Sequence, residues 1–308
     1  MKKQFYTCDV FTDVPFGGNP LAVVTDAEGM SDAVMQAVAR EFNYSETTFV
    51  LPPTRPECDV RVRIFTPTRE LPFAGHPTLG TAHVLASTGM LPLKGDTTRV
   101  VLEEGVGPVH VEIETRDGQP AATRLKAAVL PEVGPTPPPA TEIARAIGLT
   151  SGEIGSGALE PAAVSCGFPF LMVPLSAPGA LDRAVLDAEA WRKGIADFFA
   201  PDLYLFTRDP EHPDRIHARM FGPSVGVPED PATGSAAVTL AGYFASFDPT
   251  LRDTDDVEFS REIIQGVRMG RPSRLLIRGR KQSGVIESLE VGGATVMISE
   301  GRIEVPGL

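Results

Sequence analysis

The sequence predicts an α+β protein of two similar domains, each with a run of strands followed by one buried helix. Three observations lead to this fold class. The chain has 308 residues, enough for two domains of ~150 residues. Runs of apolar and β-branched residues, typical of strands, precede two helices whose small and apolar residues cover nearly every face. The starts of these two helices also align without a gap, as the copies of a duplicated domain do.

The composition is that of a folded globular protein. Hydrophobic residues make up 42% and charged residues 22%, which excludes a disordered or fibrous chain. There are 28 Lys and Arg against 40 Asp and Glu, a net charge of −12, and the cations form no cluster. We expect no nucleic-acid partner, because an acidic surface repels phosphate backbones.

The sequence predicts neither a targeting signal nor a membrane span. Cys8 and Asp9 stand where a signal peptide needs hydrocarbon, and no apolar run reaches ~18 residues. We therefore expect a soluble, cytoplasmic protein without a membrane partner. The three cysteines, Cys8, Cys58 and Cys166, are odd in number and far apart, which predicts buried free thiols rather than disulfides or a zinc site.

The first half of the chain is predicted to hold strands and two helices. Ser31 is the expected N-cap of the first helix, and Asn43 is its expected stop. The second helix, 77–88, is stopped by Gly89 and is apolar almost all round, which predicts a core position. The predicted strands are 5–13, 21–24, 47–51, 59–65, 99–104 and 109–115.

The second half repeats this pattern after a turn at 117–120. The proline-rich segment 131–140 is expected to be an extended surface connection. The last predicted helix, 231–246, is again made of small and apolar residues and is the second core helix. The other predicted elements are helices 141–147 and 187–199 and strands 163–166, 170–174, 203–207 and 216–221.

The two core helices begin with matching segments, HPTLGTA at 76–82 and DPATGSA at 230–236. Proline, glycine, a hydroxyl residue and alanine recur in register. The match predicts a duplicated domain, with a cleft between the copies as the place for a small ligand.

These helix starts predict an anion site. His76 and Asp230 stand at the expected N-cap positions, each followed by a proline at the first helical position. The positive ends of the two helices would then hold a small carboxylate. The amides expected to be free are those of Thr78, Leu79, Gly80, Ala232, Thr233 and Gly234. The alternative is two ordinary capped helices, with Asp230 bonded to its own first turn and His76 packed in the core.

Glu46 is a candidate acid/base group. It lies between a predicted helix and a predicted strand, with no other charge before Arg55. Partial burial should raise the pKa of this carboxyl towards neutrality, which suits a group that accepts and returns a proton. The alternative is a rim carboxylate paired with an arginine.

Two glycine-containing segments, 17–20 and 265–273, are predicted to be turns. Neither has the Gly-Lys-Ser/Thr ending of a phosphate loop, and the chain has no Gly-x-Gly-x-x-Gly or Gly-x-Ser-x-Gly motif. Nucleotide binding and serine hydrolysis are therefore not expected.

Several motifs resemble those of the PhzF-like family of phenazine biosynthesis isomerases, in the family's order over nearly the whole chain. They are DVFT at 9–12, FGGNPLAVV at 16–24, FNYSETTFV at 42–50, FAGHPTLG at 73–80 and DPATGSA at 230–236. The resemblance implies the diaminopimelate-epimerase-like fold: two pseudo-symmetric domains, each a curled mixed β-sheet or barrel around a central α-helix. The expected domains are 1–118 plus about 292–308, and 119–291, with the active site in the cleft between them.

The resemblance also implies an activity, namely cofactor-free isomerisation of a small cyclic amino-acid-like carboxylate such as a dihydro-hydroxyanthranilate. It implies a homodimer, no cofactor and no metal. The implied catalytic residues are Glu46 as acid/base with His76 and Asp230, and the implied substrate-binding residues are Asn19, Gly75, Thr78, Gly234 and Ser235. Related epimerases use two cysteines at the helix starts, and none stands there in this chain. An epimerase or lyase on the same scaffold, or a non-catalytic carboxylate-binding protein, are the alternatives.

Overall fold

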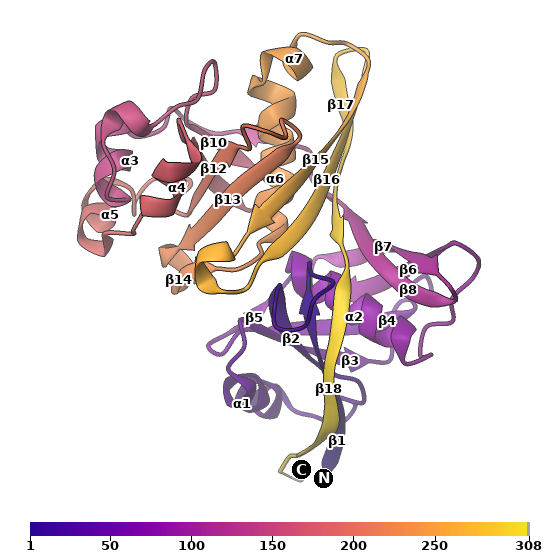
Figure 1. Cartoon of the computed structure of the whole chain (residues 1–308). Coiled ribbons are helices and arrows are strands. Elements are labelled where there is room, and N and C mark those ends of the chain that lie inside the picture. Colours follow the sequence, from indigo (N-terminus) through magenta and orange to yellow (C-terminus); the bar gives the residue numbers. More distant parts are fainter. Residues whose placement is uncertain (307–308) are drawn as a thin grey trace. The chain divides into compact units, whose positions relative to one another are not determined.

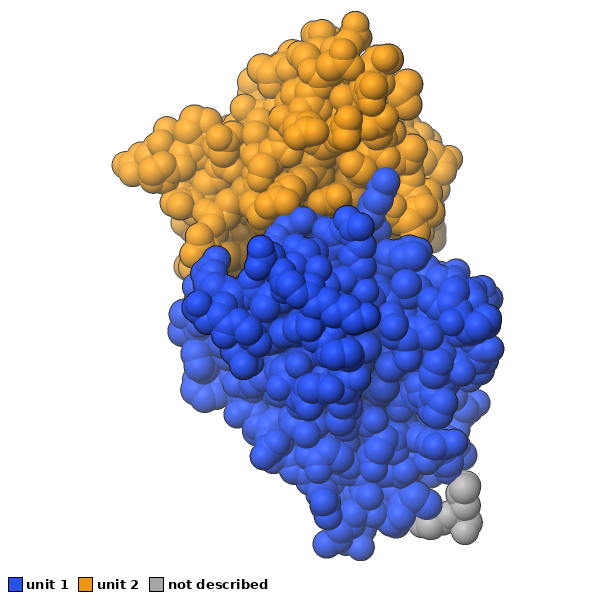
Figure 2. Space-filling model, turned by 90° about the vertical axis from the view of Figure 1, so that its right-hand side faces the viewer, with its two compact units in different colours: residues 1–126, 292–308 blue, residues 127–291 orange. Residues whose placement is uncertain are grey.

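The computed structural model describes residues 1–306 and divides into two compact units. Unit 1 comprises residues 1–126 and 292–308, and unit 2 comprises 127–291 (Figure 2). The first boundary falls after Lys126 rather than after Gly118, because the strand Gln119–Lys126 pairs with the strand before it and stays in unit 1.

Over residues 1–126 and 292–306, unit 1 contains a mixed sheet of nine strands and two helices. Figure 1 labels these elements along the chain. From β1 the pairings run antiparallel to β2, parallel to β3, antiparallel to β4, parallel to β6 and antiparallel to β7 and β8. The last strand, β18, returns to pair antiparallel with β1. The strands are β1 (Lys2–Val10), β2 (Asn19–Val24), β3 (Glu46–Leu51), β4 (Val60–Phe65), β5 (Glu70–Leu71), β6 (Thr97–Glu104), β7 (Gly107–Arg116), β8 (Gln119–Lys126) and β18 (Thr295–Glu304).

The two helices of unit 1 differ in burial. The first, α1 (Asp32–Phe42), has the expected ends: the hydroxyl of Ser31 accepts a bond from the N–H of Val34, and Asn43 closes the helix in the left-handed conformation at φ 53°. The second, α2 (Gly75–Ser87), is buried up to Ala86 and packs against β1, β2, β3, β7 and β8. The predicted core helix of this unit is thus confirmed.

The contact between α2 and the sheet depends on a glycine. A Cβ atom at Gly80 would stand 2.6 Å from side-chain carbons of both Val10 and Leu21. We expect Gly80→Ala to lower the free energy of unfolding by about 1–3 kcal/mol, because overpacking outweighs the better helix propensity of alanine. Thermal unfolding measures the effect. Gly152→Ala, where the added Cβ meets no atom within 4 Å, is the control and should leave the unfolding temperature unchanged.

Unit 2 repeats the order of unit 1. From β10 the pairings run antiparallel to β11, parallel to β12, antiparallel to β13, parallel to β15 and antiparallel to β16, the same series that starts at β1. The strands are β9 (Glu132–Val133), β10 (Ala162–Ser165), β11 (Pro169–Pro174), β12 (Leu203–Arg208), β13 (Arg215–Gly222), β14 (Val227–Asp230), β15 (Val257–Gln265), β16 (Ser273–Gln282) and β17 (Val285–Gly293).

The central helix of unit 2 is α6 (Gly234–Phe247), which is buried along most of its length and packs against β10, β11 and β16. The helix predicted over 187–199 is shorter in the structure, where α5 runs from Ala188 to Gly194 with Asp187 as its N-cap. The remaining helices are α3 (Ala140–Ala146), α4 (Pro178–Arg183), α5 (Ala188–Gly194), α7 (Pro249–Arg252) and the 3₁₀ turns Ser151–Glu153, Pro223–Val225 and Val267–Met269.

The fold class expected from the sequence is therefore confirmed as α+β with duplicated mixed sheets. Each copy contains a core helix at the corresponding place in its strand series, α2 between β5 and β6 and α6 between β14 and β15. The sheets are curled but, over residues 1–306, they do not form closed barrels.

All three cysteines are free thiols, with Cys8 and Cys58 buried as expected and Cys166 partly exposed. Burial raises the pKa of the Cys8 thiol far above its usual value. Within residues 1–306, no helix has the length and apolar character needed to cross a membrane.

Candidate functional site

The start of α2 differs from the prediction. Ala74, in extended conformation, is the N-cap, so His76 and Pro77 lie inside the first turn. The carbonyl of Ala74 accepts both the N–H of Thr78 (3.2 Å) and its hydroxyl (2.7 Å), and these bonds start the helix two residues early. The amide of Thr78 is therefore not free, and the first-turn donors are those of Gly75 and His76.

Glu46 and His76 are brought together in unit 1. Glu46 opens β3, where it pairs in register with Leu21 of β2, and its side chain is 16% exposed. Its Oε2 lies 3.3 Å from Nε2 of His76, whose side chain is 7% exposed. Burial lowers the pKa of His76 to about 3, so the imidazole is neutral at physiological pH. The pair is thus a half-buried carboxyl group beside a neutral histidine.

After the loop between β1 and β2, Asn19 is the first residue of β2. It lies two residues before Leu21, which pairs with Glu46 of β3. Asn19 is fully buried. Gly18 has φ +59°, and a Cβ there would lie 2.3 Å from the carbonyl oxygen of Val10, so only glycine fits this close turn. The carboxylate of Asp9 accepts the N–H of Phe16 (2.7 Å) across the same loop.

The start of α6 also differs from the prediction. Thr233 is the N-cap, and Asp230 is the last residue of β14. The hydroxyl of Thr233 donates to Oδ2 of Asp230 at 2.5 Å, which holds the carboxyl beside the helix start without making it the cap. The amides of the first turn of α6 are those of Gly234, Ser235 and Ala236. Ser235 is partly exposed there, and its carbonyl accepts the hydroxyl of Thr239.

Gln265 is a residue that sequence reasoning missed. It is fully buried, and its Nε2 donates to the carbonyl of Asp230 (2.8 Å) and to the hydroxyl of Thr233 (3.1 Å). Its Oε1 accepts the hydroxyl of Tyr204 (3.0 Å) and the N–H of Thr233 (3.4 Å). The amide therefore fixes both ends of the segment that carries Asp230.

The signal for Gln265 lay in the segment 265–273, which was interpreted only as a turn. Gly266 has φ +75°, and a Cβ there would lie 2.6 Å from the carbonyl oxygen of Pro231 and 2.3 Å from that of Arg271. A turn that packs this closely against the residue after Asp230 belongs to the site.

The predicted site residues thus form two groups, one in each unit. Unit 1 holds Asn19, Glu46, Gly75, His76 and Thr78, and unit 2 holds Asp230, Gly234 and Ser235. In each unit they gather at the start of the central helix and at neighbouring strand ends.

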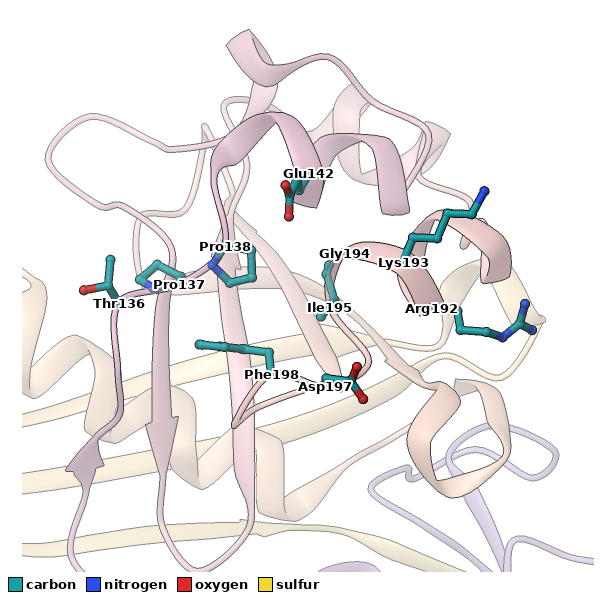
Figure 3. A pocket seen from close by; sticks show the side chains of 10 residues that line it. All are labelled: Thr136, Pro137, Pro138, Glu142, Arg192, Lys193, Gly194, Ile195, Asp197 and Phe198. Atoms are coloured by element: carbon teal, nitrogen blue, oxygen red, sulfur yellow. The ribbon is translucent and has the colours of Figure 1, made fainter.

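A separate hollow of about 330 Å³ lies in unit 2 (Figure 3). It is lined by Thr136, Pro137, Pro138, Glu142, Arg192, Lys193, Gly194, Ile195, Asp197 and Phe198. None of these is a predicted site residue. Lys193 is bonded to Glu189 (2.6 Å) on the exposed face of α5, so its charge is already paired.

The chain is similar to known proteins over nearly its whole length. The profile of the PhzC-PhzF family, described as phenazine biosynthesis-like protein, matches residues 8–301. An uncharacterized isomerase of Mesorhizobium japonicum is 40% identical, over 98% of each chain. The trans-2,3-dihydro-3-hydroxyanthranilate isomerase of Pseudomonas aeruginosa is 36% identical, over 97% of this chain and 98% of its own.

Solved structures agree with this assignment. The PhzF-family phenazine biosynthesis protein of Bacillus anthracis superposes with a TM-score of 0.86 at 24% identity, covering 99% of both chains, which shows the fold. The expected enzyme class, an isomerase with a small-molecule substrate, is confirmed by the relatives. Both the family profile and the identities establish that this chain belongs to the PhzC-PhzF family of phenazine biosynthesis-like proteins.

Proposed function

We propose that this chain is a cofactor-independent isomerase that moves a proton between carbons of a small, cyclic, amino-acid-like carboxylate. The observation that carries the proposal is the Glu46 carboxyl, 3.3 Å from the buried, neutral imidazole of His76. The substrate of the Pseudomonas aeruginosa relative, trans-2,3-dihydro-3-hydroxyanthranilate, is the model compound for this class.

Glu46 performs the proton transfer. Its carboxylate accepts a proton from one ring carbon, and the resulting carboxylic acid returns a proton to another carbon, so the substrate changes its double bonds but not its composition. His76 is not the base, because an imidazole with a pKa of about 3 binds protons too weakly. A neutral imidazole still hydrogen-bonds the carboxyl group or a polar substrate atom, and thereby orients the reaction.

Each unit offers a helix start for substrate binding. The substrate carboxylate binds at first-turn amides, those of α2 in unit 1 or those of α6 in unit 2. Asp230 and Ser235 orient the polar substituents, and Asn19 contributes its buried amide. Two-thiol racemisation has no support, because Cys8, Cys58 and Cys166 all lie outside the helix starts. The proposal also includes that the protein forms a homodimer, as the family resemblance implies, and that it is located in the cytoplasm.

Isomerisation in heavy water tests this function. We expect the protein to convert trans-2,3-dihydro-3-hydroxyanthranilate into a product of equal composition that carries deuterium at the newly protonated carbon, observed by NMR and mass spectrometry. Inversion at one carbon without a double-bond shift would mean an epimerase, and loss of water would mean a lyase. A raised unfolding temperature without any exchange would mean a binding protein. Each of these three results contradicts the proposal.

A further inference from the structure

A second carboxyl group lies beneath the first turn of α2. Glu104, the last residue of β6, is 6% exposed, and its Oε1 lies 2.7 Å from the hydroxyl oxygen of Thr78. Its Oε2 is buried and has no hydrogen-bond partner among residues 1–306. The proton transfer proposed above does not use this group, so its burial needs a separate explanation.

The hydrogen-bond partners of Glu104 favour its protonated form. The hydroxyl of Thr78 has one proton, yet it lies 2.7 Å from two oxygens, the carbonyl of Ala74 and Oε1 of Glu104. If Thr78 donates to Ala74, a carboxylate at Glu104 is left without a donor. A carboxylic acid at Glu104 donates to Thr78 instead, and both bonds are then made. The carbonyl of Ala74 also accepts the N–H of Thr78, so the hydroxyl can donate to Glu104 instead, but Oε2 of Glu104 then still has no donor among residues 1–306. A carboxylate would therefore be buried with one hydrogen bond at most, and the uncharged acid fits this site better.

The surroundings favour the same form. Burial raises the pKa of Glu104 to about 8, and the hydrogen bond of Thr78 opposes this only in part. The titratable groups of α2 are His76 and His83, and burial lowers the pKa of both, so both are neutral. On β7 the residue opposite Glu104 is Gly107. Arg61 on β4 pairs in register with Glu103, the residue before Glu104 on β6. The raised pKa of Glu104 follows from its burial, and not from these two charges.

We propose that Glu104 is a positioning residue for substrate binding, which as an uncharged acid supports the start of α2 and leaves its positive end free for the substrate carboxylate. The inference rests on the proposed function. An ionised Glu104 would place a negative charge at the helix N-terminus, where it competes with an anionic substrate. The KM for that substrate should therefore rise when Glu104 ionises, while kcat, which depends on Glu46, changes less.

The test compares the pH dependence of KM in the wild type and in Glu104→Gln. Glutamine keeps the shape, stays uncharged at every pH, and donates an N–H to Thr78. We expect the KM of the wild type to rise about fivefold above pH 8 and that of the variant to stay level. Glu57→Gln, at an exposed position, is the control and should follow the wild type. A parallel rise in all three proteins would overturn the proposal.

A second measurement needs no substrate and separates this inference from the proposed function. Folding raises the pKa of the Glu104 carboxyl from 4.5 to about 8. Between these two pH values the folded state binds more protons than the unfolded state, so the folded state loses stability as the pH rises. The unfolding temperature of Glu104→Gln should therefore exceed that of the wild type. The difference should grow between pH 5 and pH 8 and stay constant at higher pH. A margin that does not change with pH would overturn the claim that Glu104 is protonated, even if the protein turned over no substrate.

Discussion

Glu46→Gln should lower kcat by a factor of about 10²–10⁴ and change KM little, because the amide keeps the shape of the side chain but cannot accept a proton. The imidazole of His76, 3.3 Å away, cannot replace it as a base, since burial lowers its pKa to about 3. Initial rates measure kcat, and deuterium uptake from heavy water measures proton abstraction independently of product release. Both should fall together.

The matched control is Glu41→Gln, which changes an exposed carboxyl on α1, five residues before Glu46 in the sequence. It should keep wild-type rates. The unfolding temperature of Glu46→Gln should stay within a few degrees of the wild type, so that lost activity is not lost folding. Deuterium uptake that persists in this variant would remove Glu46 from the mechanism.

The order of elements could be predicted because each depends on local signals. Ser31 starts α1 and Asn43 stops it, as the cap preferences of serine and asparagine predict. The two helices made of small and apolar residues are buried, as their apolar character on every face implies. The helix starts could not be predicted from the prolines alone. In α2 the extended Ala74 accepts two bonds from Thr78, and in α6 Thr233 stands at the N-cap position while its hydroxyl donates to Asp230.

The site shows the same division between local and long-range signals. Glu46 carried a local signal, a lone carboxyl at a strand start. Its contact with His76 depends on the parallel pairing of β3 with β2 and on the packing of α2 against both strands, which no local pattern encodes. Glu104 is one acidic residue among several on β6 and β7, and only the fold shows that it is buried under α2. Gln265 has no charge or motif that distinguishes it.

Gln265→Met should have the second-largest effect, because methionine fills the space but cannot hydrogen-bond. The hydroxyl of Tyr204 and the carbonyl of Asp230 would each lose a partner inside the protein. We expect the free energy of unfolding to fall by about 2–6 kcal/mol, from two hydrogen-bonding groups at about 1–3 kcal/mol each. We also expect kcat/KM to fall by about 100-fold as Asp230 shifts from its position. Chemical denaturation and steady-state kinetics measure the two effects.

The control for this substitution is Gln282→Met, the same change at the exposed end of β16, which should alter neither quantity. A double-mutant cycle then separates positioning from general damage. If Gln265 acts through Asp230, adding Gln265→Met to Asp230→Ala should lower kcat/KM little further, because the group that the amide holds is already gone. If the two losses multiply in full, Gln265 contributes to stability alone, and the hydrogen bonds to the Asp230 segment have no catalytic consequence.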